Sequence, residues 1–518
     1  MLRENGTAAT ALFALVHMPH FQHGSGQAIE HWRGSGSTLL DQNRDSGRPG
    51  RFRSGRETGE MLESDKNHEV EGEGLPVIRR NVAGIDLGSK EHWVCAPSVD
   101  RSGREVERFG ATTPELERMA DWLKARSVES IALESTGVYW IAPHEVLQRQ
   151  GFEVILVNTR ELARVPGRKK TDRVDCKWIQ RLHSCGMLQG SFRPAEQICM
   201  LRTLVRDKGN LVAEASDWMR RMQKSLDQMN VRVHRAVSDI GGETGMAILR
   251  AIAGGQRDAR QLAKLRDPRC HQSEEQIAEQ LSGHWREDHL FSLRQGLRMY
   301  DAIQERISDY EREILRKLGE MEREECRGQE PPKPNNPNKA RALRRRGEEP
   351  LRRALYRMSG VDLTAVDALG VGTVEVVLSE YGADLSRFPS EKEFISHATL
   401  APRRLVSGGK PVKKKKRGSA SSRVAAALRM AALAMRHSPT ALGAYYRQIA
   451  RRAGANVAVF ATARKLAAWI YRLLRWGQPY VDEGAQAYEN RYQENRLRRL
   501  AATARDLGYD LTPKTAVA

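Results

Sequence analysis

The chain has 518 residues, and its 85 lysines and arginines exceed its 65 aspartates and glutamates, which gives a formal net charge of +20. A chain of this length can bury at least two hydrophobic cores. Hydrophobic residues make up 40% of it, as in folded proteins, and no apolar run approaches the roughly 18 residues that cross a bilayer. The composition therefore excludes an integral membrane protein. The charge predicts a polyanionic partner, nucleic acid before an anionic membrane surface.

The six cysteines form no C-x-x-C pair and have no regular spacing. This pattern argues against a zinc ribbon or a disulfide framework and is typical of a protein in a reducing cytoplasm. Residues 8–16 look like a short signal peptide, but no small-residue cleavage site follows them. We interpret residues 1–77, which are rich in Gly, Ser, Arg and His, as a disordered or mis-started extension with Met61 as an alternative start.

Strand and helix patterns alternate from about residue 78. Short apolar runs bounded by turn residues predict strands at residues 82–88, 92–99, 105–109, 130–134 and 152–157. Helices are expected from Thr113, as the N-cap before Pro114, to residue 124, then at residues 139–150 and after residue 170. Three consecutive strands followed by β-α-β alternation predict an α/β domain at residues 78–190, with a mixed sheet and helices packed on it.

The pattern becomes helical at residues 191–326. Apolar residues recur there at steps of three and four, namely Leu293, Leu297, Tyr300, Ile303, Ile307, Tyr310, Ile314, Leu318 and Met321. This spacing predicts a coiled coil, formed either by self-association or as an intramolecular helical hairpin, although an ordinary amphipathic core helix has a similar stripe. We expect a proline-rich linker at residues 327–350, a mostly helical basic domain at residues 351–482 and a charged helical tail at residues 483–518.

Most of the excess charge lies in one window. Residues 394–481 contain no aspartate or glutamate but 18 lysines and arginines. The densest part comprises Lys410, Lys413, Lys414, Lys415, Lys416 and Arg417. A lysine run alone is often a solvated loop, but apolar helix patterns at residues 424–435 and 460–474 flank this one. We therefore expect phosphates of a nucleic acid to neutralise this surface, with strongly salt-dependent binding.

Four carboxylates, Asp86, Glu134, Asp172 and Asp175, occupy positions that ordinary packing does not explain. Asp86 lies in an apolar strand and Glu134 ends another, whereas Asp172 and Asp175 share one face of a predicted helix. A mixed sheet can bring two strand ends together, and a helix packed across them can add its own acids. Such oxygen donors suit Mg²⁺ or Mn²⁺, and two such ions would stabilise phosphoryl transfer. Taken singly, each acid also fits a strand cap or a solvated helix face.

The motifs around these acids resemble those of the DEDD insertion-sequence transposases, Piv-type recombinases with a RuvC-like, ribonuclease-H-type amino-terminal domain. The similar motifs are AGIDLGSK at residues 83–90, LESTG at residues 133–137 and KTDRVD at residues 170–175. The resemblance implies that Asp86, Glu134, Asp172 and Asp175 are the four metal-binding acids of the family, in the same order. It also implies a RuvC-like fold for residues 78–190.

Two glycine-containing motifs mark the basic domain. LGVG at residues 369–372 lies between two expected helices, residues 363–369 and 373–381, and resembles a helix-hairpin-helix element. Gly370 and Gly372 would offer backbone N–H groups to a phosphate, although many helix pairs turn through glycine. VSGGK at residues 406–410 places Ser407 before two glycines. Ser407 is either a turn residue or a nucleophile beside a bound phosphate.

Residues 363–429 resemble the transposase domain of the same family, whose Ser-Gly motif supplies the nucleophilic serine. The resemblance implies that Ser407 is this nucleophile, with Ser419, Ser421 and Ser422 as alternatives close by. The run at residues 413–417 is more basic than expected for this loop. In total the resemblance covers about residues 78–512.

The resemblance implies a bacterial, nucleoid-associated DNA transposase that exchanges strands through a transient 5′-phosphoserine bond. Its expected partners are double-stranded donor and target DNA, a non-coding bridge RNA and further copies of itself, as a dimer or tetramer. In such an assembly the acids of one subunit act with the serine of another. The residues alone leave two other functions open, a metal-dependent nuclease of the Holliday-junction type and a non-catalytic nucleic-acid-binding protein.

Overall fold

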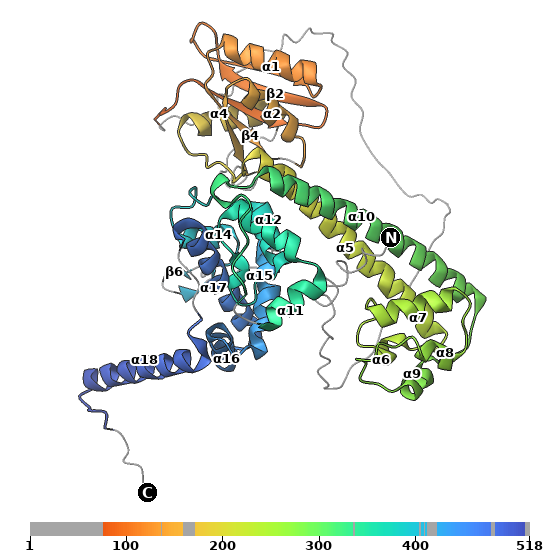
Figure 1. Cartoon of the computed structure of the whole chain (residues 1–518). Coiled ribbons are helices and arrows are strands. Elements are labelled where there is room, and N and C mark those ends of the chain that lie inside the picture. The colour runs from red at the N-terminus through yellow and green to blue at the C-terminus, as the bar shows by residue number, and fades with distance from the viewer. Residues whose placement is uncertain are drawn as a thin grey trace, which may run out of the picture. The chain divides into compact units, whose positions relative to one another are not determined.

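The computed structural model describes residues 76–135, 137–158, 171–334, 337–402, 406–408, 410–411, 422–477 and 482–512. These residues divide into two compact units, with the boundary between Arg193 and Pro194. The first unit contains a five-stranded sheet, and the second is helical apart from a two-stranded hairpin (Figure 1). The mixed sheet combined with many helices confirms the expected class, α/β plus α. In the described parts of the chain, every helix is too short or too polar to span a bilayer.

The sheet has the strand order β3-β2-β1-β4-β5. Its strands are β1 (Val82–Leu87), β2 (Glu91–Pro97), β3 (Arg104–Gly110), β4 (Ser130–Glu134) and β5 (Glu153–Val157). β2 pairs antiparallel with β1 and β3, whereas β4 pairs parallel with β1 and β5. Each strand overlaps a range predicted from the sequence, so the apolar runs and turn residues identified the sheet correctly.

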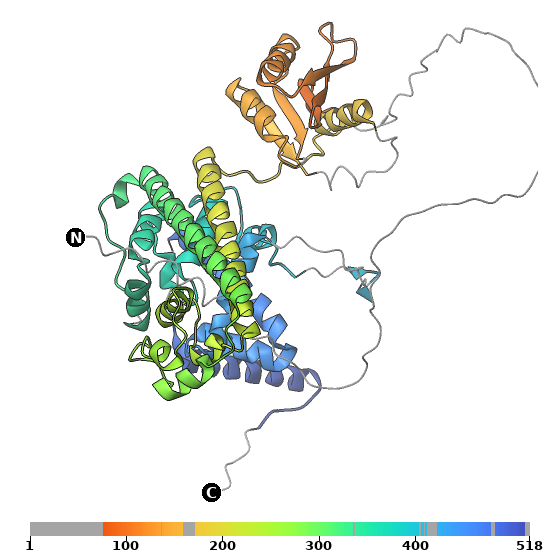
Figure 2. The same cartoon turned by 90° about the vertical axis from the view of Figure 1, so that its right-hand side faces the viewer.

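Helices cover both faces of the sheet. They are α1 (Thr113–Ala125), α2 (Ile141–Arg149) and α4 (Asp172–Ser184). α1 and α2 share a core with one face, and α4 packs on the opposite face (Figure 2). The N-cap of α1 is Thr112, one residue before the predicted Thr113, because Thr112 keeps an extended backbone and Thr113 is already helical.

The side-chain alternation of the strands assigns each acid to a face. Ile85 and Leu133 belong to the core that contains α1 and α2. Ala132, in contrast, packs with Ile179 of α4. Because successive side chains of a strand point to opposite faces, the residues after Ile85 and Leu133 belong to the face that carries α4.

The second unit begins with a long helical hairpin. Helix α5 (Glu196–Gln228) runs to a group of short helices, and α10 (Glu287–Glu320) returns alongside it (Figure 1). The short helices are α6 (Val233–Ala236), α7 (Glu243–Ala253), α8 (Ala259–Ala263) and α9 (Glu274–Leu281). The predicted apolar stripe of α10 thus packs within the chain, as the hairpin alternative requires, and it carries no argument for self-association.

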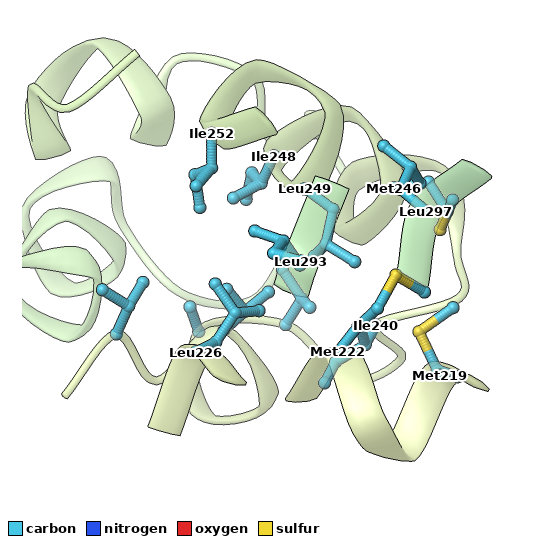
Figure 3. Packing of buried hydrophobic residues seen from close by; sticks show 14 of the residues in the cluster. Met219, Met222, Leu226, Ile240, Met246, Ile248, Leu249, Ile252, Leu293 and Leu297 are labelled. Atoms are coloured by element: carbon cyan, nitrogen blue, oxygen red, sulfur yellow. The ribbon is translucent and has the colours of Figure 1, made fainter. Parts of the chain in front are cut away.

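The hairpin and the short helices share one core (Figure 3). Met222 and Leu226 of α5 pack with Leu293 and Leu297 of α10 and with side chains of α7. The helices approach closely at Gly296, where a Cβ atom would lie 2.7 Å from Cγ of Met222. A larger side chain there would require Met222 or one of the two helices to shift.

The rest of the second unit is built from helices and one hairpin. In chain order these are η3 (Glu324–Cys326), α11 (Pro337–Arg346), α12 (Glu349–Ser359), η4 (Leu363–Ala365), α13 (Val371–Tyr381), α14 (Glu391–His397), β6 (Val406–Ser407), β7 (Lys410–Pro411), α15 (Arg423–Ala434), η5 (Met435–His437), α16 (Ala441–Ala453), α17 (Ala455–Trp476) and α18 (Gly484–Asp506). Helix α18 is the predicted charged helical tail, and it buries none of its side chains.

Two local predictions differ from the structure. The segment predicted as a linker, residues 327–350, contains α11, which buries Leu343. The helix predicted at residues 363–369 is only the short turn η4. The side chain of Asp362 accepts a hydrogen bond from the backbone N–H of Thr364 at 3.0 Å, and Ala368 has a φ of +71°. A local side-chain bond and a left-handed residue both oppose a continuous helix.

Candidate active site

Asp86 and Glu134 lie side by side at the carboxyl edge of the sheet. Ile85 of β1 pairs with Leu133 of β4 in parallel register, and the two acids are the next residues along these strands. Both side chains are half-buried and belong to the face that carries α4. The strand order therefore brings together two carboxylates that are 48 positions apart in the sequence.

Helix α4 contributes the other two acids from its first turn. The hydroxyl of Thr171, its N-cap, accepts a hydrogen bond from the backbone N–H of Val174 at 3.3 Å, which fixes where the helix begins. Asp172 is exposed, whereas Asp175 is 5% exposed. The positive end of the helix dipole favours negative charge at both positions.

Contacts farther along α4 fix the helix on the sheet. The amide nitrogen of Gln180 donates a hydrogen bond to the carbonyl of Val82 at 3.2 Å, and Nε2 of His183 lies 2.9 Å from Oγ of Ser130. Gly84 makes the close approach possible, because a Cβ atom there would lie 2.6 Å from the carbonyl oxygen of Cys176. The position of the first turn of α4 is thus set by β1 and β4, the strands that carry Asp86 and Glu134.

The electrostatics of Asp86 show that the four acids act on one another. Burial raises the pKa of Asp86 to about 6, and repulsion from Glu134, Asp175 and Asp172 contributes to the same shift. All three other acids therefore lie close enough to disfavour the charge of Asp86. The structure thus brings together the acids predicted from the sequence.

The donor set fits a divalent cation. Four carboxylates supply hard oxygen ligands, and their mutual repulsion is relieved by a positive ion. Among the described residues, no group of three or more His, Cys, Asp or Glu side chains is already arranged as ligands of one ion. Binding of one ion by all four acids would therefore require these side chains to move closer together.

The predicted serine motif lies in the second unit, in the hairpin of β6 and β7. The backbone of Ser407 pairs with that of Lys410. Between them Gly408 is exposed and has a φ of +57°, a conformation that favours glycine. The positions of Lys413, Lys414, Lys415, Lys416, Arg417, Ser419 and Ser421 lie outside the described residues.

The remaining predicted positions have structural roles that the structure describes. Ser422 is the N-cap of α15, because its hydroxyl accepts from the backbone N–H of Ala425 at 3.0 Å and donates to the carbonyl of Ala398 at 2.9 Å. Gly370 is the exposed N-cap of α13, with open space where a Cβ would stand, and Gly372 lies in the first turn.

Sequence reasoning missed the residues that support the acids. Gln180 and His183 carry no signal in a sequence alone, because their importance arises from the contact between α4 and the sheet. Gly84 does carry one, since a glycine inside a strand often marks the close approach of another backbone. An exposed apolar segment was also missed. Val138, Tyr139 and Ile141 follow Glu134 closely and are 68%, 46% and 40% exposed. The signal available was the run of uncharged residues that follows the LESTG motif.

Comparison with known protein families matches both units. A model described as a transposase of the DEDD type from the IS110 group matches residues 83–231, which include all four acids. A second model, described as transposase IS116/IS110/IS902 family, matches residues 362–447, which include Ser407. No curated protein matches the chain. Members of the DEDD family use divalent metal ions. The chain therefore belongs to the IS110 family of DEDD transposases, enzymes that transpose the DNA of insertion sequences.

Proposed function

We propose that this transposase cleaves and exchanges DNA strands under the guidance of a bridge RNA, with a RuvC-like sheet unit and a serine nucleophile. The observation that carries the proposal is the effect of Glu134, Asp172 and Asp175 on Asp86, whose pKa they help to raise to about 6. Such a concentration of carboxylates at the edge of a sheet is costly for folding and is typical of a functional site. The order of the motifs along the chain adds support.

The cofactor in this proposal is Mg²⁺ or Mn²⁺. Asp86, Glu134, Asp172 and Asp175 would hold it at the carboxyl edge of β1 and β4. When bound, the ion supplies positive charge that stabilises the negative charge developing on a scissile phosphate. The chain supplies the rigid support, since Gln180 and His183 hold α4 on the sheet and thereby position Asp172 and Asp175.

The nucleophile in this proposal is Ser407. Its hydroxyl oxygen forms a bond to the phosphorus, the bond from phosphorus to the 3′ oxygen breaks, and this oxygen leaves as a hydroxyl with the proton of the serine. A 3′ hydroxyl of the partner strand then attacks the 5′-phosphoserine, restoring the serine and one phosphodiester. The hairpin supports the assignment, because the exposed Gly408 leaves room for a DNA backbone beside Ser407.

The partners in this proposal are double-stranded donor and target DNA, the bridge RNA and further copies of the chain. In a dimer or a tetramer, the acids of one subunit would act with Ser407 of another. The acid-free window at residues 394–481 supports binding of polyanions, since it carries 18 positive side chains. The protein would act in the bacterial cytoplasm, on the nucleoid.

One observation favours a second function. The four acids are brought together within the first unit alone, whereas Ser407 belongs to the second. A metal-dependent nuclease would need only the acids and a water molecule. In that case the Ser407 motif would be a turn.

Denaturing gels distinguish these functions. The full chain is incubated with Mg²⁺, the RNA transcribed from the non-coding DNA beside its gene, and duplexes that carry the ends and the target of its element. Strand exchange predicts a covalent protein–DNA adduct that is lost in Ser407→Ala and retained in Ser308→Ala, an exposed serine on α10. Free nicked ends that persist in Ser407→Ala would establish the nuclease. Binding without cleavage, unchanged by Asp86→Ala, would indicate a binding protein.

A further inference from the structure

An uncharged segment leaves the sheet directly after Glu134. The backbone N–H of Ser135 donates to the carbonyl of Val157 at 2.9 Å, so the segment departs from the carboxyl edge, where Asp86 and Glu134 lie. Residues 135–143 contain no charged side chain. Three apolar side chains nevertheless face solvent there, since Val138, Tyr139 and Ile141 are 68%, 46% and 40% exposed.

Contacts of the neighbouring Trp140 fix the position of this exposed segment. Trp140 packs partly buried against the core of the sheet, and its ring lies 5.8 Å from the ring of His144. The guanidinium of Arg193 lies 5.4 Å from the centroid of the Trp140 ring and also forms a hydrogen bond with His144. Trp140 therefore anchors the segment to the sheet, while Tyr139 before it remains outside.

The ring of Tyr139 lies next to a turn. Gly137 has a φ of +55°, and a Cβ atom on it would lie 3.7 Å from Cδ2 and Cε2 of the Tyr139 ring. One edge of the ring is thus near the Gly137 turn, and 46% of the residue is exposed. An exposed aromatic ring on a segment anchored by its neighbour suits stacking of a planar group.

The chain length limits what this ring can reach. Five residues of chain span at most about 18 Å, and a strand of duplex DNA rises about 3.4 Å per nucleotide. Nucleotides within about five positions of a phosphate bound at Glu134 are therefore in reach of Tyr139. Because the segment carries no cation, it suits the face of a base rather than a phosphate.

We infer that Tyr139, with Val138 and Ile141 beside it, stacks on an unpaired DNA base next to the scissile phosphate. This inference rests on the proposed function, because it assumes cleavage at the four acids. Stacking holds the unpaired base against the segment and so fixes the adjoining phosphate at the carboxyl edge. Tyr139 is a positioning residue in this scheme and takes no part in bond making.

A cycle of paired changes tests this contact. The full chain with its RNA is given duplexes of its own element, intact or with one abasic nucleotide at each of the five positions on either side of the scissile phosphate. We expect Tyr139→Ala to slow cleavage about tenfold and one abasic position to slow the unchanged protein by a similar factor. The two changes together should slow cleavage no more than either change alone. Tyr139→Trp should cleave at the rate of the unchanged protein.

Val99→Ala is the matched control, because Val99 is a 62% exposed apolar residue after β2, at the opposite edge of the same sheet. It should cleave every duplex like the unchanged protein. Two results would overturn the inference while leaving cleavage by the acids intact. One is a normal cleavage rate in Tyr139→Ala. The other is that, at every abasic position, the factor by which the abasic nucleotide slows cleavage multiplies the factor from Tyr139→Ala. Measuring the binding affinity of each duplex in an Asp86→Asn background, with and without Tyr139→Ala, separates stacking from chemistry. If the unchanged protein fails to cleave, but Tyr139→Ala and the abasic nucleotide still weaken binding no more together than either does alone, only the proposed function fails.

Discussion

The carbonyl oxygen of Cys176 in α4 lies where the side chain of residue 84 would begin, 2.6 Å from the Cβ position of Gly84. The backbone nitrogen of Gln180 is closer still, and its Cα atom lies 2.7 Å from the same position. Atoms of a helix backbone therefore occupy the space above β1, and a glycine is required beneath them. Two residues beyond Gly84 is Asp86, so the same contact sets the distance between Asp86 and the acids of α4.

We expect Gly84→Ala to displace α4 from the sheet, because the atoms that its methyl group would meet belong to backbone and cannot rotate away. The change should lower the melting temperature of the first unit and abolish metal-dependent cleavage. Gly103→Ala is the matched control, since Gly103 lies in the turn before β3 with nothing within 4 Å of its Cβ position. Normal cleavage by Gly84→Ala would show that the position of α4 does not matter.

The charge of Asp86 should destabilise the protein in the absence of metal. Its pKa is about 6 when folded and 3.8 when unperturbed, so the folded state binds the proton more tightly. The destabilisation therefore begins as the pH rises above the unperturbed value and is complete above the folded one. In EDTA at pH 7, Asp86→Asn should raise the melting temperature by a few degrees, on the order expected for a small domain. A lower melting temperature would contradict this assignment.

A buried ion pair in the second unit gives a third prediction. Nζ of Lys208 on α5 donates to Oε1 of Glu375 on α13 at 2.6 Å, and both side chains are buried. Removing one partner of such a pair costs about 3 kcal/mol or more. Burial raises the pKa of Glu311 and of Glu348, and the charge of Glu375 adds to both shifts, whereas Lys208 opposes them.

Lys208→Met should therefore destabilise the protein more than Glu375→Gln, because it leaves three acids without their shared cation. Urea unfolding of both variants measures the difference. The exposed pair Arg294 and Glu287, at 3.5 Å, is the control, and Glu287→Gln should cost less than about 1 kcal/mol. Equal decreases in the free energy of unfolding for Lys208→Met and Glu375→Gln would show that Lys208 does not stabilise Glu311 and Glu348.

The basic run at residues 413–417 should bind phosphates without regard to sequence. Replacing Lys413, Lys414, Lys415 and Lys416 by glutamine should weaken binding to all DNA and RNA about equally. The slope of log K against log salt should fall by about 0.9 for each duplex phosphate that the variant no longer neutralises. Arg316→Gln is the control, because Arg316 pairs with Glu313 and Glu320 on α10. An unchanged slope would place the bound phosphates elsewhere.

The sequence located the strands of the sheet and the four acids. Apolar runs with turn residues at their ends mark β1 and β4, and the helix expected after residue 170 begins at Asp172. A mixed sheet could bring two strand ends together, but the chain passes through β2, β3 and α1 between β1 and β4. The parallel pairing that sets Asp86 beside Glu134 is therefore established by the structure.

The remaining features depend on contacts between distant residues or on competing local bonds. Lys208 and Glu375 are 167 positions apart, and neither belongs to a motif. The prolines before α11 suggested a linker, although Pro337 occupies the first position of the helix, where proline is favoured. The apolar stripe of α10 was compatible with two arrangements, and only its packing against Met222 and Leu226 identifies the hairpin.

Binding of Mn²⁺ to the full chain without nucleic acid tests the central claim most directly. Calorimetric titration at pH 7 should show binding that is abolished in Asp86→Asn and in Asp175→Asn. Asp121→Asn, which changes an exposed acid on α1, should bind like the unchanged protein. Binding that survives in both cluster variants, or that is lost equally in Asp121→Asn, would contradict a metal site formed by the four acids.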